Sequence, residues 1–190
     1  MTVTATAADG STLYRGRAPE SSTGPSPVGG AVTFDAPPGK LQLRLVMEGD
    51  SPGEVIDSEQ RDIVVPDFTA PVTAFGTPQV FRARTIPEMQ RVKADPRATP
   101  VAAREFSRTD RLLIVAGTYA PGQVAPKVTA RLLNRANQRV ADIEVTRRDD
   151  GAALAEVALA SLAPGEYGVE LAATGDAGEA RQLVAFRITP

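Results

Sequence analysis

Apolar and polar residues alternate along much of the chain, in short runs that are separated by turns. The alternation is clearest at residues 40–48, where Leu41, Leu43, Leu45 and Met47 fall on one face of an extended strand. A period of two predicts strands that bury one face, which is typical of antiparallel sheets. We therefore predict an all-β protein.

One hairpin pattern occurs twice. The segment PGKLQLRLVMEGDSPGE begins at Pro38, and PGEYGVELAATGDAGEA begins at Pro164. Each contains a Pro-Gly turn, an alternating strand, a Gly-Asp turn and a second strand. Because the two copies lie in different halves of the 190-residue chain, we predict two immunoglobulin-like antiparallel β-sandwich domains, joined by a segment with a short helix.

The first predicted domain spans residues 1–67, with a hairpin signal at Asp9-Gly10. Its strands are expected at residues 2–8, 11–17, 31–35, 40–48 and 54–65. These are fewer strands than the roughly seven of a complete immunoglobulin sandwich. We therefore expect an edge that upstream sequence or a partner strand completes. Pairing of residues 2–8 on both sides within a closed sandwich would contradict this expectation.

The second predicted domain spans residues 110–190 and has the more regular pattern. Its strands are expected at residues 111–119, 127–135, 139–146, 152–159, 166–173 and 180–189. Alternation places three sets of side chains inside: Ala141, Ile143 and Val145; Tyr167, Val169 and Leu171; and Val184, Phe186 and Ile188.

Residues 68–109 are expected to connect the two domains. A strand is expected within residues 72–84, and a short helix over about residues 86–94. Thr85 is the predicted N-cap, with Pro87 in the first turn and Glu88 completing a capping box. The connection ends at residue 109, where the strand pattern of the second domain begins.

The chain contains no histidine, cysteine or tryptophan. This composition excludes a Ser-His-Asp triad, a thiol nucleophile and a metal site built from imidazole or thiolate ligands. Carboxylate pairs that share a strand face, Asp57 with Glu59 and Glu166 with Glu170, are interpreted as solvated side chains. We therefore predict no enzyme, and no catalytic, cofactor-binding or metal-binding residue.

Two acidic turns are candidate calcium loops. Asp149-Asp150-Gly151 and the pair Asp176 with Glu179 lack the ligand spacing of an EF-hand. Asp and Gly are also the ordinary residues of hairpin turns, and this interpretation is favoured.

Residues 80–111 hold eight basic and four acidic side chains, although the whole chain has a net charge of −2. The segment either docks an acidic protein partner, or its cations pair with Glu88, Asp95, Glu105 and Asp110. The candidate partner-binding residues are Arg82, Arg84, Arg91, Lys93, Arg97, Arg104 and Arg108. Nucleic acid is not expected as a partner, because the flanking segments are acidic and stacking rings are few.

Aromatic residues make up only 5% of the chain. Tyr14 and Tyr119 are the candidates for a carbohydrate-binding surface, which is the alternative function. The run Leu162-Ala-Pro-Gly-Glu-Tyr167 resembles the tyrosine corner of immunoglobulin and fibronectin type III sandwiches, in which the hydroxyl bonds back to the chain. Tyr167 is therefore given a structural role.

Longer segments resemble one family. REFSRTDRLLI from Arg104, VTARLLNRANQ from Val128, and LAPGEYGVELAA followed by LVAFRIT are similar to the C-terminal region of exported bacterial VWFA-related domain proteins, common in acidobacterial-type genomes. AVTFDAPPGKLQLRL and VIDSEQRDIVVPD resemble the segment just before it. The resemblance implies the β-sandwich tail of a larger exported protein, in the periplasm or outside the cell. The metal-binding Asp-x-Ser-x-Ser loop of that family is absent from this sequence.

Residues 2–20 carry no signal peptide, and no run approaches the roughly 20 apolar residues that span a bilayer. Met1 is interpreted as lying inside a longer protein. The predicted function is a non-catalytic structural or protein-interaction module. Its partner is another protein or the upstream part of the same polypeptide, and a small-molecule ligand is not expected.

Overall fold

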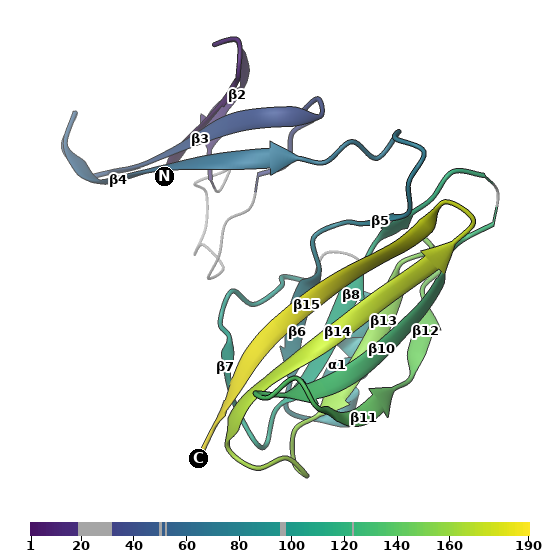
Figure 1. The fold of residues 1–190 in the computed structure, drawn as a ribbon. Coiled ribbons are helices and arrows are strands. Elements are labelled where there is room, and N and C mark those ends of the chain that lie inside the picture. The colour runs from purple at the N-terminus through teal and green to yellow at the C-terminus, as the bar shows by residue number, and fades with distance from the viewer. Residues whose placement is uncertain (19–31, 50, 52, 96–97, 123) are drawn as a thin grey trace. The chain divides into compact units, whose positions relative to one another are not determined.

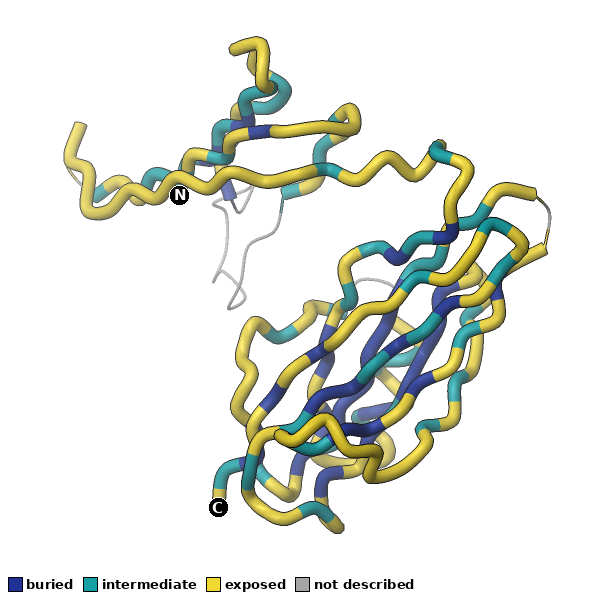
Figure 2. The backbone as a smooth tube through the Cα atoms, viewed as in Figure 1, coloured by how far each residue is buried: buried dark blue, intermediate teal, exposed yellow. Residues whose placement is uncertain are grey.

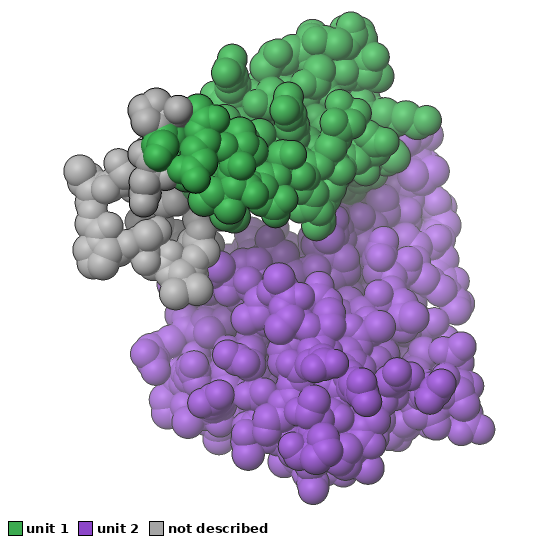
Figure 3. Space-filling view, turned by 90° about the vertical axis from the view of Figure 1, so that its left-hand side faces the viewer, with its two compact units in different colours: residues 1–68 green, residues 69–190 purple. Residues whose placement is uncertain are grey.

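The computed structural model describes residues 1–18, 32–49, 51, 53–95, 98–122 and 124–190. The chain divides into two compact units, Met1–Phe68 and Thr69–Pro190, which are coloured separately in Figure 3. The described residues form β-strands and one helix, α1 (Ile86–Ala94), as Figure 1 shows. The predicted all-β class is confirmed. No helix within the described ranges is long and apolar enough to span a membrane.

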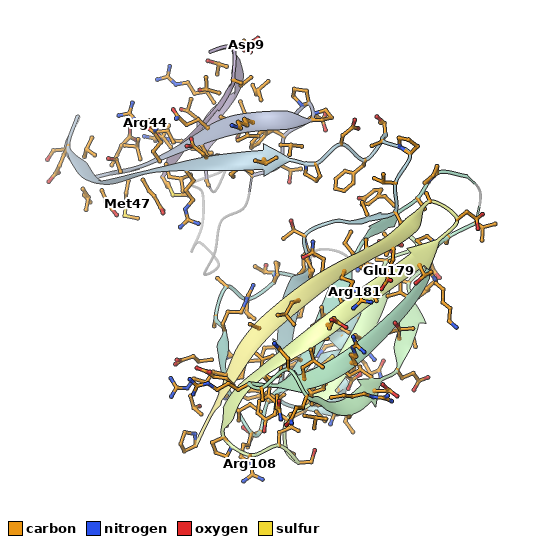
Figure 4. All side chains as sticks on the ribbon, in the orientation of Figure 1. Asp9, Arg44, Met47, Arg108, Glu179 and Arg181 are labelled. Carbon is orange, nitrogen blue, oxygen red and sulfur yellow. The ribbon has the colours of Figure 1, made fainter. Side chains whose placement is uncertain are left out.

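The described part of the first unit contains one four-stranded antiparallel sheet, in the order β2–β1–β3–β4. Its strands are β1 (Thr2–Ala7), β2 (Thr12–Arg17), β3 (Gly39–Glu48) and β4 (Val55–Val65). Val3, Ala5 and Leu41 are buried on its apolar face. Met47, at the other end of the β3 apolar row, is 47% exposed (Figure 4). The predicted apolar face of β3 is therefore buried at Leu41 and exposed to solvent at Met47.

The strand expected at residues 31–35 is not formed in its described part, residues 32–35. Pro37 and Pro38 follow after Ala36, and neither proline has an N–H group for a sheet ladder. Phe34 instead stacks on Tyr14, with the ring centroids 5.0 Å apart. This segment therefore contributes a side-chain contact to the unit and no strand.

The strand at residues 2–7 is not an open edge. β1 pairs with β2 on one side and with β3 on the other, so the edge that upstream sequence or a partner strand is expected to complete lies at another strand and stays a prediction. The sheet is nevertheless open, because the described residues leave β2 and β4 each with one neighbour.

The second unit is a sandwich of two sheets, in the orders β6–β8–β13–β12 and β11–β10–β14–β15–β7. Their strands are β6 (Gln79–Ala83), β7 (Glu105–Ser107), β8 (Arg111–Ala116), β10 (Lys127–Asn134), β11 (Arg139–Ile143), β12 (Val145–Arg147), β13 (Ala153–Ala158), β14 (Gly165–Gly175) and β15 (Gly178–Thr189). β5 (Ala74–Phe75) and β9 (Thr118–Tyr119) form a separate pair. Between the sheets lies a core that includes Ile114, Leu171 and Phe186. Figure 2 shows the buried stretches of these strands in dark blue.

Residues 69–109 belong to this second unit and do not form a separate connection. β6 pairs with β8, and β7 pairs in parallel with β15. Phe106 of β7 and Met89 of α1 are 2% and 1% exposed. The interpretation of this segment as a linker is corrected, because it supplies one strand to each sheet.

Two predicted strands are each divided. Residues 111–119 form β8 and β9, and residues 139–146 form β11 and β12, which lie in different sheets. Ala141 lies opposite the buried Leu132 but is exposed, because β11 is an edge strand. Val169, Leu171, Val184, Phe186 and Ile188 are buried as predicted.

The helix begins where its cap was predicted. Thr85 Oγ1 accepts a hydrogen bond from the Glu88 N–H at 3.2 Å. The Glu88 carboxylate accepts the N–H of Arg84 at 2.8 Å. This bond leads the interactions that lower the pKa of Glu88.

Candidate protein-binding surface

The outer faces of the two sheets in the second unit differ in their cover. α1 lies on the outer face of the β6–β8–β13–β12 sheet, where Met89 packs in a buried cluster with Phe81 and Leu113. The described residues place no helix on the outer face of the other sheet (Figure 1). That second outer face is the larger open sheet surface of the unit.

An apolar patch, formed by Leu133, Gly168, Leu183 and Ala185, lies on this open face. Leu133 is opposite Gly168 on β14, which is opposite Ala185 on β15. Leu183 is 57% exposed, and these residues line a hollow of about 520 Å³. A Cβ atom at Gly168 would lie only 2.8 Å from Leu183 Cδ1. Glycine at position 168 therefore lets the Leu183 side chain lie down across β14.

Charges of both signs surround the apolar patch. Arg135 Nε lies 3.3 Å from Glu166 Oε2, and Arg187 Nη1 lies 3.9 Å from Glu105 Oε1. All four side chains are more than half exposed. The patch thus has an apolar centre and a polar rim, the arrangement found in protein–protein interfaces.

A row of charges crosses the same face beside the patch. Glu170 on β14 is bridged by Arg131 from β10 and by Arg181 from β15, the latter at 3.8 Å. Arg181 also bonds to Glu179 at 2.7 Å, and Figure 4 shows these two side chains together. With Arg139 and Asp142, this row lines a second hollow of about 530 Å³.

Tyr167 makes the hydrogen bond expected of a tyrosine corner. Its hydroxyl donates to the carbonyl oxygen of Ala163 at 3.1 Å, and its ring stacks on Phe186 at 6.0 Å between centroids. The side chain fixes the chain at the entry to β14, and it also lines the edge of the apolar hollow.

Four of the basic residues singled out from the sequence have partners within the second unit. Arg84 Nε lies 3.6 Å from Asp110 Oδ1, and Lys93 Nζ lies 2.7 Å from Glu156 Oε2. Arg104 Nη1 donates to the carbonyls of residues 101–103, and Arg108 Nη2 donates to the carbonyl of Ala160. These cations mainly hold turns and the helix in place.

The remaining candidates do not complete a single basic surface. Arg82 and Arg91 line a hollow of about 590 Å³ together with the acidic residues Glu88 and Asp95. Among the described residues, neither guanidinium group makes a hydrogen bond or a close ion pair, although the charge of Arg91 helps to lower the pKa of Glu88. Arg97 lies outside the described residues. The structure thus distributes the described candidates over several places, and among them only Arg104 borders the apolar patch.

Glu156 is the common partner of two cations. Lys93 from α1 and Arg111 from β8 both bind its carboxylate, at 2.7 Å and 2.9 Å. Partial burial raises the pKa of this carboxyl, but the hydrogen bonds from Lys93 and Arg111 outweigh it and leave the pKa below the ordinary 4.5. The cluster fastens the helix to the sheet that it covers.

Replacing Glu156 with glutamine is expected to lower the free energy of unfolding by about 1–2 kcal/mol at neutral pH. Because the pKa of Glu156 is lower in the folded than in the unfolded protein, its ionised carboxylate stabilises the wild type at pH values above 4.5. This stabilisation is lost as the pH falls through the pKa of the folded protein. Urea unfolding of both proteins at neutral pH and near pH ~3 measures this difference. Glu179→Gln, which removes an exposed ion pair, is the control and should change stability by less than about 0.5 kcal/mol. Equal losses at both pH values would contradict the assignment.

Asp150 and Glu179, one from each of the two acidic turns, have local partners, and Glu179 bonds to Arg181 as described above. Asp150 accepts hydrogen bonds from Arg148 Nε at 3.0 Å and from the Ala152 N–H at 3.1 Å. Within the described ranges, no three carboxylates come together as a metal site would require. Among the paired carboxylates, Glu59 bonds to Arg61, and Glu166 and Glu170 bond to arginines as described above.

The two tyrosines proposed for sugar binding are placed differently. Tyr14 is stacked on Phe34, so one ring face is already covered. Tyr119 is 42% exposed, and a Cβ atom at Gly76 or Gly117 would touch its ring. Leu183, the exposed residue of the apolar patch, was not predicted from the sequence. Its signal was the run Leu183 to Phe186, whose apolar residues cannot all point into the core.

No protein-family model matches the chain, and no characterised protein matches its sequence significantly. The resemblance to VWFA-related proteins therefore stays a prediction.

Proposed function

We propose that the chain is a non-catalytic protein-binding module whose second unit is an immunoglobulin-like sandwich. The order β6–β8–β13–β12 corresponds to strands A, B, E and D of an immunoglobulin domain. β10, β14 and β15 correspond to C, F and G, with β11 beside C. The hydrogen bond from Tyr167 to Ala163 supports the same correspondence.

The observation that carries the proposed function is the exposed Leu183 in an apolar hollow, on the outer face over which the described residues place no helix. Binding energy at protein interfaces is concentrated in a few apolar anchors surrounded by a polar rim. A partner that places an aliphatic or aromatic side chain against Leu183 would meet rim charges of both signs. Proteins supply such mixed surfaces, whereas carbohydrate sites depend on exposed aromatic rings.

We place this module in an exported bacterial protein, in the periplasm or outside the cell. The support is the sequence resemblance described above, including the segments from Arg104 and Val128. The partner is then another exported protein or the upstream part of the same polypeptide.

The test is photo-cross-linking in cells of the source organism, with a benzophenone amino acid at position 183 of the full-length chain. We expect one discrete adduct heavier than the 20.0 kDa chain, in a fraction outside the cytoplasm. The same amino acid at Ile86, which is 63% exposed on α1, is the matched control and should give none. Binding of the identified protein should weaken about tenfold or more with Leu183→Ala.

Equal cross-linking from positions 183 and 86 would contradict the assigned face. Binding on a glycan array that disappears with Tyr119→Ala or Tyr14→Ala, but not with Leu183→Ala, would instead establish the carbohydrate-binding alternative.

A further inference from the structure

β4 presents a long open edge in the first unit. It is an 11-residue strand in which every residue except Val65 is exposed, as Figure 2 shows along nearly its whole length. Its ladder with β3 is regular from the pair Gly39 and Val65 to the pair Met47 and Asp57. Within the described residues, no strand pairs with its other side. A regular edge of this length offers its unpaired N–H and C=O groups to another strand.

The related hairpin in the second unit has this position filled. There the strands are β14 and β15, and β7 pairs with the outer side of β15. In the first unit the strands are β3 and β4, and the described residues contain no equivalent of β7. The same hairpin pattern is thus covered at its outer strand in one unit and open in the other.

When β4 is reversed about Gln60, its central charges and its terminal aliphatic residues find matching partners, whereas Asp57 falls opposite Ile63 and Ser58 opposite Asp62. The strand reads Val-Ile-Asp-Ser-Glu-Gln-Arg-Asp-Ile-Val-Val from residue 55 to residue 65. In an antiparallel pair of two copies centred on Gln60, Glu59 lies opposite Arg61 of the second copy. Ile56 lies opposite Val64 of the second copy. Each pair occurs twice, because a twofold axis makes the contact reciprocal.

The side chains of both kinds of pair are exposed to solvent and can therefore contact a second copy. Ile56 and Val64 are 64% and 69% exposed, and cross-strand aliphatic contact would remove part of this surface from water. Glu59 and Arg61 are 49% and 64% exposed, and they pair with each other at 2.6 Å. In the pair of strands each would gain an opposite charge from the second copy.

Neighbouring registers lack this complementarity. An antiparallel pair centred on residue 59 places Glu59 opposite its own copy, and one centred on residue 61 places Arg61 opposite its own copy. The register centred on Gln60 brings no like charges opposite each other. Charged edges ordinarily discourage pairing, but here the order of the charges favours one register and one partner.

We propose that β4 is a homodimerisation edge, on which β4 of a second copy pairs antiparallel about a twofold axis at Gln60. The two four-stranded sheets then form one continuous sheet of two copies. This interface is separate from the apolar patch around Leu183, so it goes beyond the proposed function and does not depend on it.

The experiment exploits the reciprocity of the central charges. The full chain is measured by size-exclusion chromatography with light scattering over a dilution series. We expect wild-type protein to reach about twice the 20.0 kDa mass of one chain. Glu59→Arg and Arg61→Glu should each weaken self-association about tenfold or more, because each places like charges opposite one another twice. An equimolar mixture of the two variants should recover the dimer, because every arginine then faces a glutamate.

The mixture also controls for folding, since a misfolded variant would not be rescued by the other. Arg15→Glu makes the same charge change on β2, the other edge of the sheet, and should leave the dimer unaffected. A wild-type chain that stays at 20.0 kDa at every concentration would overturn the proposal. So would a dimer that persists in both single variants, or one that is lost with Arg15→Glu.

Discussion

Replacing Phe106 with alanine is expected to lower the free energy of unfolding of the second unit by about 3–5 kcal/mol. Phe106 is 2% exposed and meets Phe186 edge-on, with 6.4 Å between the ring centroids. Truncation removes the ring and leaves a cavity between the sheets that the surrounding strands fill only partly. Small domains are typically stable by about 5–15 kcal/mol, so this loss is a large fraction of the total.

Chemical unfolding monitored by hydrogen exchange measures this effect separately in the two units. Peptides from β8 and β14 report on the second unit, whereas peptides from β1 and β3 report on the first. The control is Ile86→Ala, which truncates an exposed aliphatic side chain of α1 and should change stability by no more than about 0.5 kcal/mol. A loss below about 1 kcal/mol for Phe106→Ala would show that residues 69–109 connect the units without forming part of the core.

The sequence predicted the strands of the second sandwich most clearly where a strand buries only one face, as β15 does. Val184, Phe186 and Ile188 alternate with exposed or outward residues, and this periodicity is a local property. The sequence of β7 shows no such alternation. It has three residues, of which one is buried, and its place is fixed by parallel pairing with the distant β15.

The local alternation also could not predict where a strand is divided or to which sheet each part belongs. The alternation of Ile143 and Val145 continues without interruption, yet β11 and β12 belong to different sheets. A strand that crosses from one sheet to the other keeps its alternation, because each sheet buries one face toward the same core. The crossing therefore changes the neighbours of a strand and not its sequence pattern.

The candidate surface was less accessible to sequence reasoning than the fold. The basic segment suggested a patch, but Lys93 and Arg108 find partners from distant parts of the chain, Glu156 and Ala160. Leu183 forms an apolar patch only together with Leu133 and Gly168, which lie on neighbouring strands. Both results depend on contacts between residues far apart in sequence, which composition and spacing do not contain.

Replacing Asp110 with alanine is expected to destabilise the second unit by about 2–3 kcal/mol. Asp110 is 3% exposed, and its Oδ2 atom accepts the N–H of Ser107 at 2.8 Å. Its Oδ1 atom lies 3.6 Å from Arg84 Nε without making a hydrogen bond. Alanine would leave the Ser107 N–H without its acceptor and would remove the charge that faces Arg84. Because Arg84 is 70% exposed, water replaces that charge at little cost, and the lost backbone acceptor dominates.

Urea unfolding of three variants separates the hydrogen bond from the charge. Asp110→Asn keeps an oxygen for Ser107 and should lose about 1 kcal/mol, less than Asp110→Ala. Thr109→Ala removes only an exposed hydroxyl contact in the same turn and should change stability by less than about 0.5 kcal/mol. If asparagine destabilises as much as alanine, the charge and not the acceptor stabilises the turn between β7 and β8. If alanine stabilises the unit, the desolvation of a carboxylate with one unbonded oxygen outweighs its hydrogen bond, and the carboxylate is retained for a reason other than stability.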